Sequence, residues 1–221
     1  MNYFANALAI KDDFLSASIS TLYMTFFTAI FAGLVGLILG VILVTTRPGA
    51  ILENKFLNSF LDKLINLLRS VPFIIMLTFI APLTRLIAGT SIGQRAAIVP
   101  LFFAAFPFFA KQVESALADV DKGVIEAALS MGDSNADIIL RVYLKEGLAN
   151  IIRASSLTLI SLVGLTAMAG AIGAGGLGQI AINVGYGRFQ DDVTLVCLII
   201  ILIIVFIIQG VSNILIKKVE K

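Results

Sequence analysis

Long apolar runs, separated by shorter polar segments, make up most of this 221-residue chain. An α-helix needs about 20 mostly apolar residues to cross a bilayer. Five segments approach or exceed that length: residues 18–44, 64–83, 96–110, 154–173 and 193–216. The second contains two prolines, and the third, bounded by Arg95 and Lys111, contains two more. The pattern therefore predicts an all-α, polytopic membrane protein, with five transmembrane helices in a single domain of residues 1–221.

The composition supports this interpretation and removes several classes of function. Hydrophobic residues make up 59% of the chain, charged residues only 14%, and the mean hydropathy is +1.02. In soluble domains about 25% of residues are charged. With no histidine and a single cysteine, Cys197, the chain lacks disulfides, zinc-type spacings and His-dependent triads. A net charge of +2 gives no reason to expect a nucleic-acid partner. We therefore expect no enzymatic activity, no cofactor and no metal.

The distribution of basic residues predicts how the chain is oriented. Five crossings place the two termini on opposite sides of the membrane. With the N-terminus outside, only four of the sixteen basic residues lie outside: Lys11, Arg85, Arg95 and Arg188. The other twelve lie inside, and cytoplasmic loops carry the excess of Lys and Arg. We therefore expect the N-terminus outside and the C-terminus in the cytoplasm.

One polar segment, at about residues 111–153, stands out between the third and fourth apolar runs. Val124, Ala127, Ala128 and Met131 repeat at the spacing of one helix face, which predicts a short amphipathic helix. Gly132 follows directly, and glycine most readily adopts the left-handed conformation that ends a helix. We expect a cytoplasmic loop here, which either docks a soluble partner or merely connects two spans.

A second short helix is expected after that turn. Asp133 or Ser134 is suited to cap it, and Ser134 and Asp137 have the spacing of a capping box. Its apolar side is formed by three residues: Ile138, Ile139 and Val142. Gly147 is the expected end of this helix before the fourth span.

The loop carries a motif with a known counterpart. Glu126-Ala127-Ala128, then three residues, Gly132, nine residues and the triplet 142–144 resemble the EAA loop of ABC importer permeases. In that family the loop forms the coupling helix, which sits in a cleft of the ATP-hydrolysing subunit. The resemblance therefore implies that Glu126, Ala127, Ala128 and Gly132 couple this chain to an ATPase.

Two positions of the loop depart from the family pattern. Val142 stands where the family commonly has isoleucine, and Lys145 stands where it usually has proline. Because lysine keeps its backbone N–H, the second helix need not break at Lys145.

The resemblance extends over nearly the whole chain and becomes more specific. Four further segments look like the permease subunit of bacterial methionine importers: 46–49, 69–73, 89–93 and 173–179. This resemblance implies the type I ABC importer permease fold and a homodimer in the bacterial inner or plasma membrane, surrounded by lipid. It also implies ABC ATPase subunits, an extracytoplasmic substrate-binding (lipo)protein, and import of D- or L-methionine by alternating access.

The glycine-rich segment after the fourth span allows two interpretations. Gly173, Gly175 and Gly178 spell G-x-G-x-x-G, the dinucleotide-binding pattern, but that motif requires a preceding strand. A transmembrane-length run precedes it instead, so we expect a break in the helix beside the translocation path or a subunit interface. Met168, Gly170 and Gly173 are the candidate residues of this path or gate, with ordinary packing as the alternative for Met168.

Several alternatives remain open from the residues alone. Arg69 is interpreted as a snorkelling arginine at the cytoplasmic interface, with a functional role as the alternative. Asp191 or Asp192 is expected to cap the fifth span. The alternative functions are a permease for another small amino acid or a methionine derivative, an ATP-independent secondary carrier, and a membrane scaffold or enzyme. No ionisable residue lies at the centre of a clearly apolar span, which argues against an ion-coupled carrier.

Overall fold

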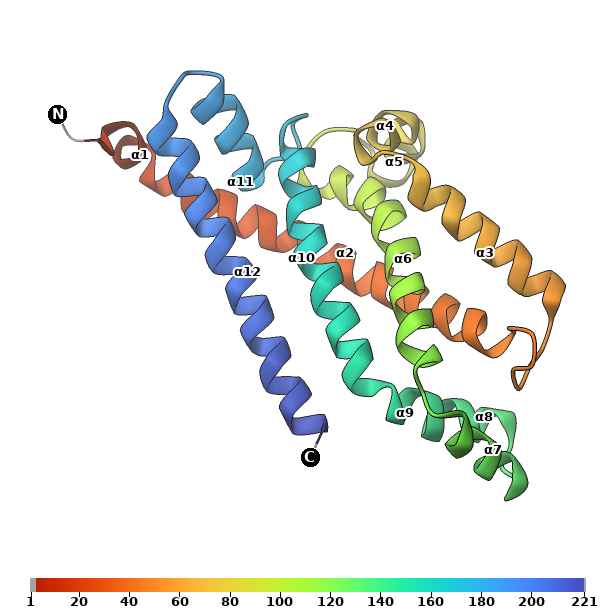
Figure 1. Ribbon diagram of the computed structural model, residues 1–221. Coiled ribbons are helices and arrows are strands. Elements are labelled where there is room, and N and C mark those ends of the chain that lie inside the picture. The colour runs from red at the N-terminus through yellow and green to blue at the C-terminus, as the bar shows by residue number, and fades with distance from the viewer. Residues whose placement is uncertain (1–2, 221) are drawn as a thin grey trace.

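The computed structural model describes residues 3–220, and within that range the chain is helical and contains no β-strand (Figure 1). Four helices of the described range are long and apolar enough to cross a membrane. They are α2 (Lys11–Thr45), α6 (Gln94–Ala118), α10 (Leu148–Gly170) and α12 (Asp191–Val219). These helices correspond to the first, third, fourth and fifth expected spans. The all-α, polytopic fold predicted from the apolar runs is therefore confirmed.

The third span is longer and more regular than its sequence suggests. Pro100 and Pro107 both lie inside α6, which runs without interruption for 25 residues. Proline removes one helical hydrogen bond, but neighbouring helices compensate for this in membrane helices. Both prolines are buried, so the packed surroundings hold the helix together at these positions.

The second expected span is not one helix. α3 (Lys55–Ser70) is followed by α4 (Phe73–Phe79) and α5 (Ala81–Ala88). The break falls at Val71, whose φ of −78° and ψ of 121° are extended, because the residue before a proline disfavours the helical conformation. α3 runs beside α6 and leads to α4 and α5 at the end of the molecule where α6 begins (Figure 1). The second expected span is therefore a segment broken into three helices.

Close contact between backbones joins α2 to α6. Gly36 and Gly40 are four residues apart on α2, an arrangement that lets membrane helices approach closely. A Cβ added at Gly36 would lie 2.9 Å from the carbonyl oxygen of Phe106, and one at Gly40 would lie 2.6 Å from Cβ of Val113. The two helices consequently pack as one unit, around which α3 and α10 are arranged.

A small cap covers the end of the molecule at which α12 begins. It comprises α1 (Ala5–Ala9), α11 (Gly176–Gln179) and the π-helix η2 (Ile180–Tyr186). The buried carboxylate of Asp192 accepts hydrogen bonds from the N–H of Ala7 at 2.9 Å and from Asn6 Nδ2 at 3.1 Å. The expected capping of α12 by Asp191 or Asp192 is wrong: Gln190 occupies the cap position, without a side-chain bond. Asp192 instead fastens α1 to α12.

The two ends of the chain lie at opposite ends of the long helices (Figure 1). The short helices α7 to α9 lie at the same end as the C-terminal end of α12. Large apolar side chains remain exposed along the outer face of α12, Leu198, Leu202 and Phe206 among them. Such a surface is expected for a helix whose solvent is lipid, since soluble proteins rarely expose extended apolar patches.

Candidate functional site

The segment between α6 and α10 forms a layer of short helices beyond the ends of the long ones (Figure 1). It contains α7 (Lys122–Ser130), α8 (Asn135–Asp137), the π-helix η1 (Ile138–Tyr143) and α9 (Leu144–Glu146). The sequence prediction of a helix, a turn and a second helix is confirmed. Both ends of the expected 111–153 segment belong to the long helices, so the loop itself comprises residues 119–147.

The turn at Gly132 has the geometry that the sequence predicts. Its φ is +85°, in the left-handed region. The N–H of Asp133 donates to the carbonyl of Ala128 at 3.2 Å, and the N–H of Gly132 donates to that of Leu129 at 3.1 Å. These two bonds define a Schellman motif, which satisfies carbonyls that the helix end would otherwise leave without partners. The angle between the two halves of the loop is thereby fixed.

The inward face of α7 differs from the predicted one. Ala128, which the resemblance assigns to the coupling surface, is buried in this chain, and its buried neighbour on α7 is Ile125. Val124 and Met131, both assigned to the apolar stripe, are 43% and 77% exposed. Apolar residues form a broad side of α7, opposite Lys122, Glu126 and Ser130, so its periodicity did not single out which of them pack inward.

The outward face of α7 is consequently apolar and without a partner in the described chain. Glu126 and Ala127 are exposed, together with Val124 and Met131. A small residue, Ala127, lies between the two larger apolar side chains and leaves room for another surface to approach. Of the motif residues, Glu126 and Ala127 therefore face outward, whereas Ala128 packs inward.

The second half of the loop joins α7 to the long helices. Ser134 Oγ accepts a hydrogen bond from the N–H of Asp137 at 3.2 Å, so the predicted cap is confirmed. Ile138 and Val142 are buried in one cluster that also contains residues of α2, α6, α7 and α10. Gly147 ends α9 at the expected place, and a Cβ there would lie 2.6 Å from the Leu117 side chain. α7 and the second half of the loop therefore share one buried cluster with α2, α6 and α10.

A cluster of four charged side chains lies next to the loop, where α2, α3 and α6 meet. Arg47 donates to Glu114 at 2.7 Å, and Lys111 donates to Glu114 at 2.6 Å and to Asp62 at 2.5 Å. The Glu114 side chain is only 7% exposed. The count of basic residues placed Arg47 and Lys111 on the cytoplasmic side but did not indicate their acidic partners. Glu114 is on α6 with Lys111, whereas Asp62 comes from α3.

A cleft of about 440 Å³ separates residues 47–51 from α7. Arg47, Lys122, Glu126 and Tyr143 contribute its polar groups. Burial raises the pKa of the Tyr143 hydroxyl above its ordinary value, and the nearby Arg47 charge opposes this shift. The cleft presents charges of both signs beside the outward face of α7, which suits a polar protein surface.

The glycine segment after α10 turns the chain sharply, as the sequence predicts. Gly173, Gly175 and Gly176 have φ values of +93°, +90° and +79°, which favour glycine. A Cβ at Gly178 would lie 2.3 Å from the carbonyl oxygen of Ala167, so α11 packs directly on the α10 backbone. The preceding element is a helix, which removes the strand that a dinucleotide-binding turn requires.

The three candidate path residues occupy different environments. Gly170 is buried against α11, where a Cβ would lie 2.5 Å from the N atom of Gln179. Gly173 accepts a hydrogen bond from the N–H of Gly93 at 3.0 Å, which connects the glycine turn to the start of α6. Met168 is 43% exposed on α10 and takes no part in these contacts. Gly170 and Gly173 thus belong to one tightly packed turn, and Met168 faces outward.

Comparison with known proteins decides the family. The family model described as "Binding-protein-dependent transport system inner membrane component" matches residues 34–221, a range that includes both the loop and the glycine turn. The chain belongs to this family. The expectation of a permease with several membrane-spanning helices, drawn from the EAA-type loop, is therefore confirmed.

Relatives of this permease share most of its length. The probable D-methionine transport system permease protein MetI of Vibrio cholerae is 42% identical over 220 residues, 99% of this chain and 98% of that protein. The methionine import system permease protein MetP of Bacillus subtilis is 43% identical over 180 residues, 81% of each.

Solved structures resemble this permease closely. An inward-facing structure of the MetNI methionine ABC transporter gives a TM-score of 0.93 at 42% identity, covering 96% of this chain and 98% of that one. A structure of an amino acid ABC transporter gives a TM-score of 0.80 at 20% identity and covers 97% of this chain, which shows a shared fold.

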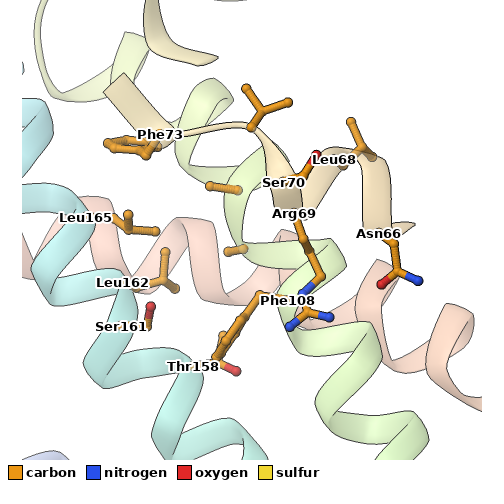
Figure 2. A pocket seen from close by; sticks show the side chains of 13 residues that line it. Asn66, Leu68, Arg69, Ser70, Phe73, Phe108, Thr158, Ser161, Leu162 and Leu165 are labelled. Atoms are coloured by element: carbon orange, nitrogen blue, oxygen red, sulfur yellow. The ribbon is translucent and has the colours of Figure 1, made fainter. Parts of the chain in front are cut away.

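Arg69 of the permease lies near the Phe108 ring, with its guanidinium carbon 6.0 Å from the ring centroid. Phe108 is one helical turn from Lys111, which pairs with Asp62 and Glu114 at the charged end of the third expected span. The interpretation of Arg69 as a snorkelling arginine at the cytoplasmic interface therefore stays a prediction. Figure 2 shows Arg69 in a cleft between α3, α6 and α10.

Proposed function

We propose that this chain is the membrane permease of an ATP-driven importer that moves methionine into the cytoplasm by alternating access. The observation that carries the proposal is the match to methionine permeases and to the MetNI transporter over almost the entire chain. At 42% identity over 99% of the chain, the first of these matches extends over the loop, the broken second span and the glycine turn.

The coupling step in this proposal uses the outward face of α7. Ala127 and Gly132 place a small surface opposite an ATPase subunit, and the adjacent cleft, with Arg47, Lys122 and Glu126, receives polar groups of that subunit. Buried contacts of Ile125 and Ala128 with η1 then transmit the ATPase movement to α6 and α10. The permease itself hydrolyses nothing, and the energy comes from its partner.

The assembly in this proposal has two copies of the chain, two ABC ATPase subunits and an extracytoplasmic substrate-binding protein. Five crossings in one chain are too few to enclose a path, so a second copy completes it. The excess of basic residues near α7, including Arg47, Arg141 and Lys145, supports a cytoplasmic position for this end. The N-terminus is then outside and the C-terminus inside.

The proposed path runs along the side of α10 that carries Met168. The glycine turn at Gly170 and Gly173 fixes the outer end of α10, and the exposed thioether of Met168 projects from the helix close to this turn. A flexible apolar side chain is suited to closing a narrow passage, because methionine adapts its shape to its surroundings.

Uptake by the reconstituted complex tests the function. Proteoliposomes would hold the permease with its cognate ATPase, with ATP inside and the substrate-binding protein and labelled methionine outside. ATP-dependent uptake that unlabelled methionine competes is the expected result. Hydrolysis without methionine uptake would remove the substrate assignment, and uptake without ATP would remove the ATP-driven mechanism.

An Ala127→Trp variant tests the coupling surface. Ala127 is exposed, so tryptophan there spares the interior of the loop but obstructs a docked partner. Overpacking costs about 1–3 kcal/mol, which corresponds to an affinity for the ATPase about 5- to 150-fold weaker. Ala9→Trp, at an exposed position of α1 at the opposite end, is the matched control. Equal ATPase binding by both variants would contradict the assignment of this face.

A further inference from the structure

A cleft of about 470 Å³ opens where α3 breaks and α4 begins (Figure 2). Its walls come from three segments: the α3–α4 junction, the middle of α6 and the middle of α10. Thr158, one of its lining residues, is about 15 Å from the start of α10 and about 18 Å from its end. The cleft therefore lies about half-way along α6 and α10, on the part of their apolar segments nearer Lys111 and Arg153. Its size is within the range of small-molecule sites, about 300–1,000 Å³.

Arg69 is the one charged side chain that lines this cleft. Within residues 3–220, no Asp or Glu forms a salt bridge with it. An ionised side chain at membrane depth is costly unless it is paired, and such residues commonly mark substrate pathways. The aromatic ring of Phe108 supplies only a weak cation–π contact. The guanidinium, with its planar fork of N–H donors, is thus available for a carboxylate, which it binds in a bidentate manner.

Besides Ser161, three polar groups of the cleft each present an oxygen that can accept a hydrogen bond. Ser70 Oγ donates to the carbonyl of Leu67 at 2.7 Å, and Thr158 Oγ1 donates to that of Ala154 at 2.8 Å. Asn66 donates through Nδ2 to Asp62 at 3.0 Å, which leaves its Oδ1 as an acceptor. An ammonium group has three donors and no acceptor, so these oxygens suit it.

The remaining wall is apolar. Phe73, Leu162 and Leu165 line it, and Phe73 and Leu162 are buried in the main core cluster. A flexible thioether side chain suits such a wall, since sulfur makes favourable contacts with aromatic rings. One positive fork, several acceptor oxygens and an apolar wall together match a zwitterionic α-amino acid with an apolar side chain.

We infer that this cleft binds the transported amino acid inside the membrane, with Arg69 holding its carboxylate. The inference rests on the proposed function, because it assigns a step of the same import. It places a substrate site in the permease itself, at the α3–α4 break, about half-way along α6 and α10. The ammonium group then lies among the oxygens of Asn66, Ser70 and Thr158, and the side chain lies against the apolar wall.

Photo-cross-linking tests the site without the substrate-binding protein, whose own selectivity would obscure the result. A diazirine analogue of methionine would be irradiated with the detergent-purified permease–ATPase complex, and the labelled peptides identified by mass spectrometry. We expect labelling of the apolar wall, competed by methionine but at least about tenfold less well by methioninamide, which lacks the carboxylate. A charge-assisted hydrogen bond contributes enough binding free energy to account for a tenfold difference between methionine and methioninamide.

Variants at Arg69 complete the test. Arg69→Gln should lose the labelling and the discrimination against methioninamide, whereas Arg69→Lys should retain part of both. Arg85→Gln is the matched control, since Arg85 occupies the last turn of α5 as Arg69 does that of α3. Basal ATPase activity and a single size-exclusion peak report that a variant is folded. Where a variant does not fold, the comparison of methionine with methioninamide on the unmodified complex still tests whether the site binds a carboxylate.

Two outcomes overturn the inference and leave the proposed function standing. One is labelling elsewhere in the chain, and the other is equal competition by methionine and methioninamide. In either case the unmodified complex would still import methionine into proteoliposomes with ATP. Failure of that uptake, by contrast, would remove the proposed function itself.

Discussion

Replacing Glu114 by glutamine should destabilise the permease more than any change at an exposed carboxylate. Glu114 is 7% exposed and accepts from both Arg47 and Lys111, which belong to the end of α2 and to α6. Glutamine keeps the size of the side chain but removes the charge. Arg47 is then left without its acidic partner, and Lys111 keeps only Asp62.

The magnitude follows from the burial of the partners. Breaking a buried ion pair by removing one partner costs about 3–5 kcal/mol. The Arg47 and Lys111 side chains are 39% and 21% exposed, so solvent screens part of the loss. We therefore expect a destabilisation of about 2–3 kcal/mol, which for a chain of this size lowers Tm by about 4–12 °C.

The decrease in Tm is measured on the detergent-purified permease, by heating followed by size-exclusion chromatography. Glu146→Gln, at an exposed position of α9, is the matched control and should shift Tm by about 2 °C at most. Arg47→Met combined with Glu114→Gln should cost less than the sum of the single changes, because no charge of that pair is left unpartnered. A Glu114→Gln permease within about 2 °C of the unmodified chain would refute the assignment of a stabilising ion cluster.

Two further changes test the glycines that the fold requires. Gly178→Ala places a Cβ 2.3 Å from the carbonyl oxygen of Ala167, so α11 must move from α10, at a cost of about 1–3 kcal/mol. A lower yield of folded permease in size-exclusion chromatography is expected, whereas Gly164→Ala, where the added Cβ meets no atom within 4 Å, should be neutral. Gly132→Val forces a β-branched residue to a φ of +85°, costs about 1–2 kcal/mol, and should raise the ATP hydrolysed per methionine imported. An unchanged ratio would show that the turn does not transmit the coupling movement.

Local chemistry in the sequence predicted the turn of the loop but not the face of α7 that packs inward. Gly132, Ser134 and Asp137 act through neighbours within a few residues, so their roles could be inferred from spacing alone. The inward face depends instead on the packing of α7 against η1, within a cluster that buries Ile125 and leaves Met131 exposed. The apolar side of α7 is broad, so the periodicity could not distinguish the residues that pack inward.

Contacts between distant segments were not predictable in the same way. Glu114 lies 67 residues from Arg47, and Lys111 lies 49 residues from Asp62. A count of basic residues can indicate the side of the membrane, but it cannot indicate which of them meet. The prolines of span two indicated an interruption, but they did not indicate that the segment divides into three separate helices, α3, α4 and α5.

The break between α3 and α4 also bears on the leakage of ions. The first N–H groups of α4 and the last carbonyls of α3 have no partners within their own helices, and such groups are tolerated at membrane depth only beside protein or water. We therefore expect water rather than lipid in the cleft at Arg69. A hydrated passage would conduct protons and sodium ions, but a fixed guanidinium charge within it repels them. The same arginine is thus expected to help preserve the ion gradients of the membrane while the permease is open.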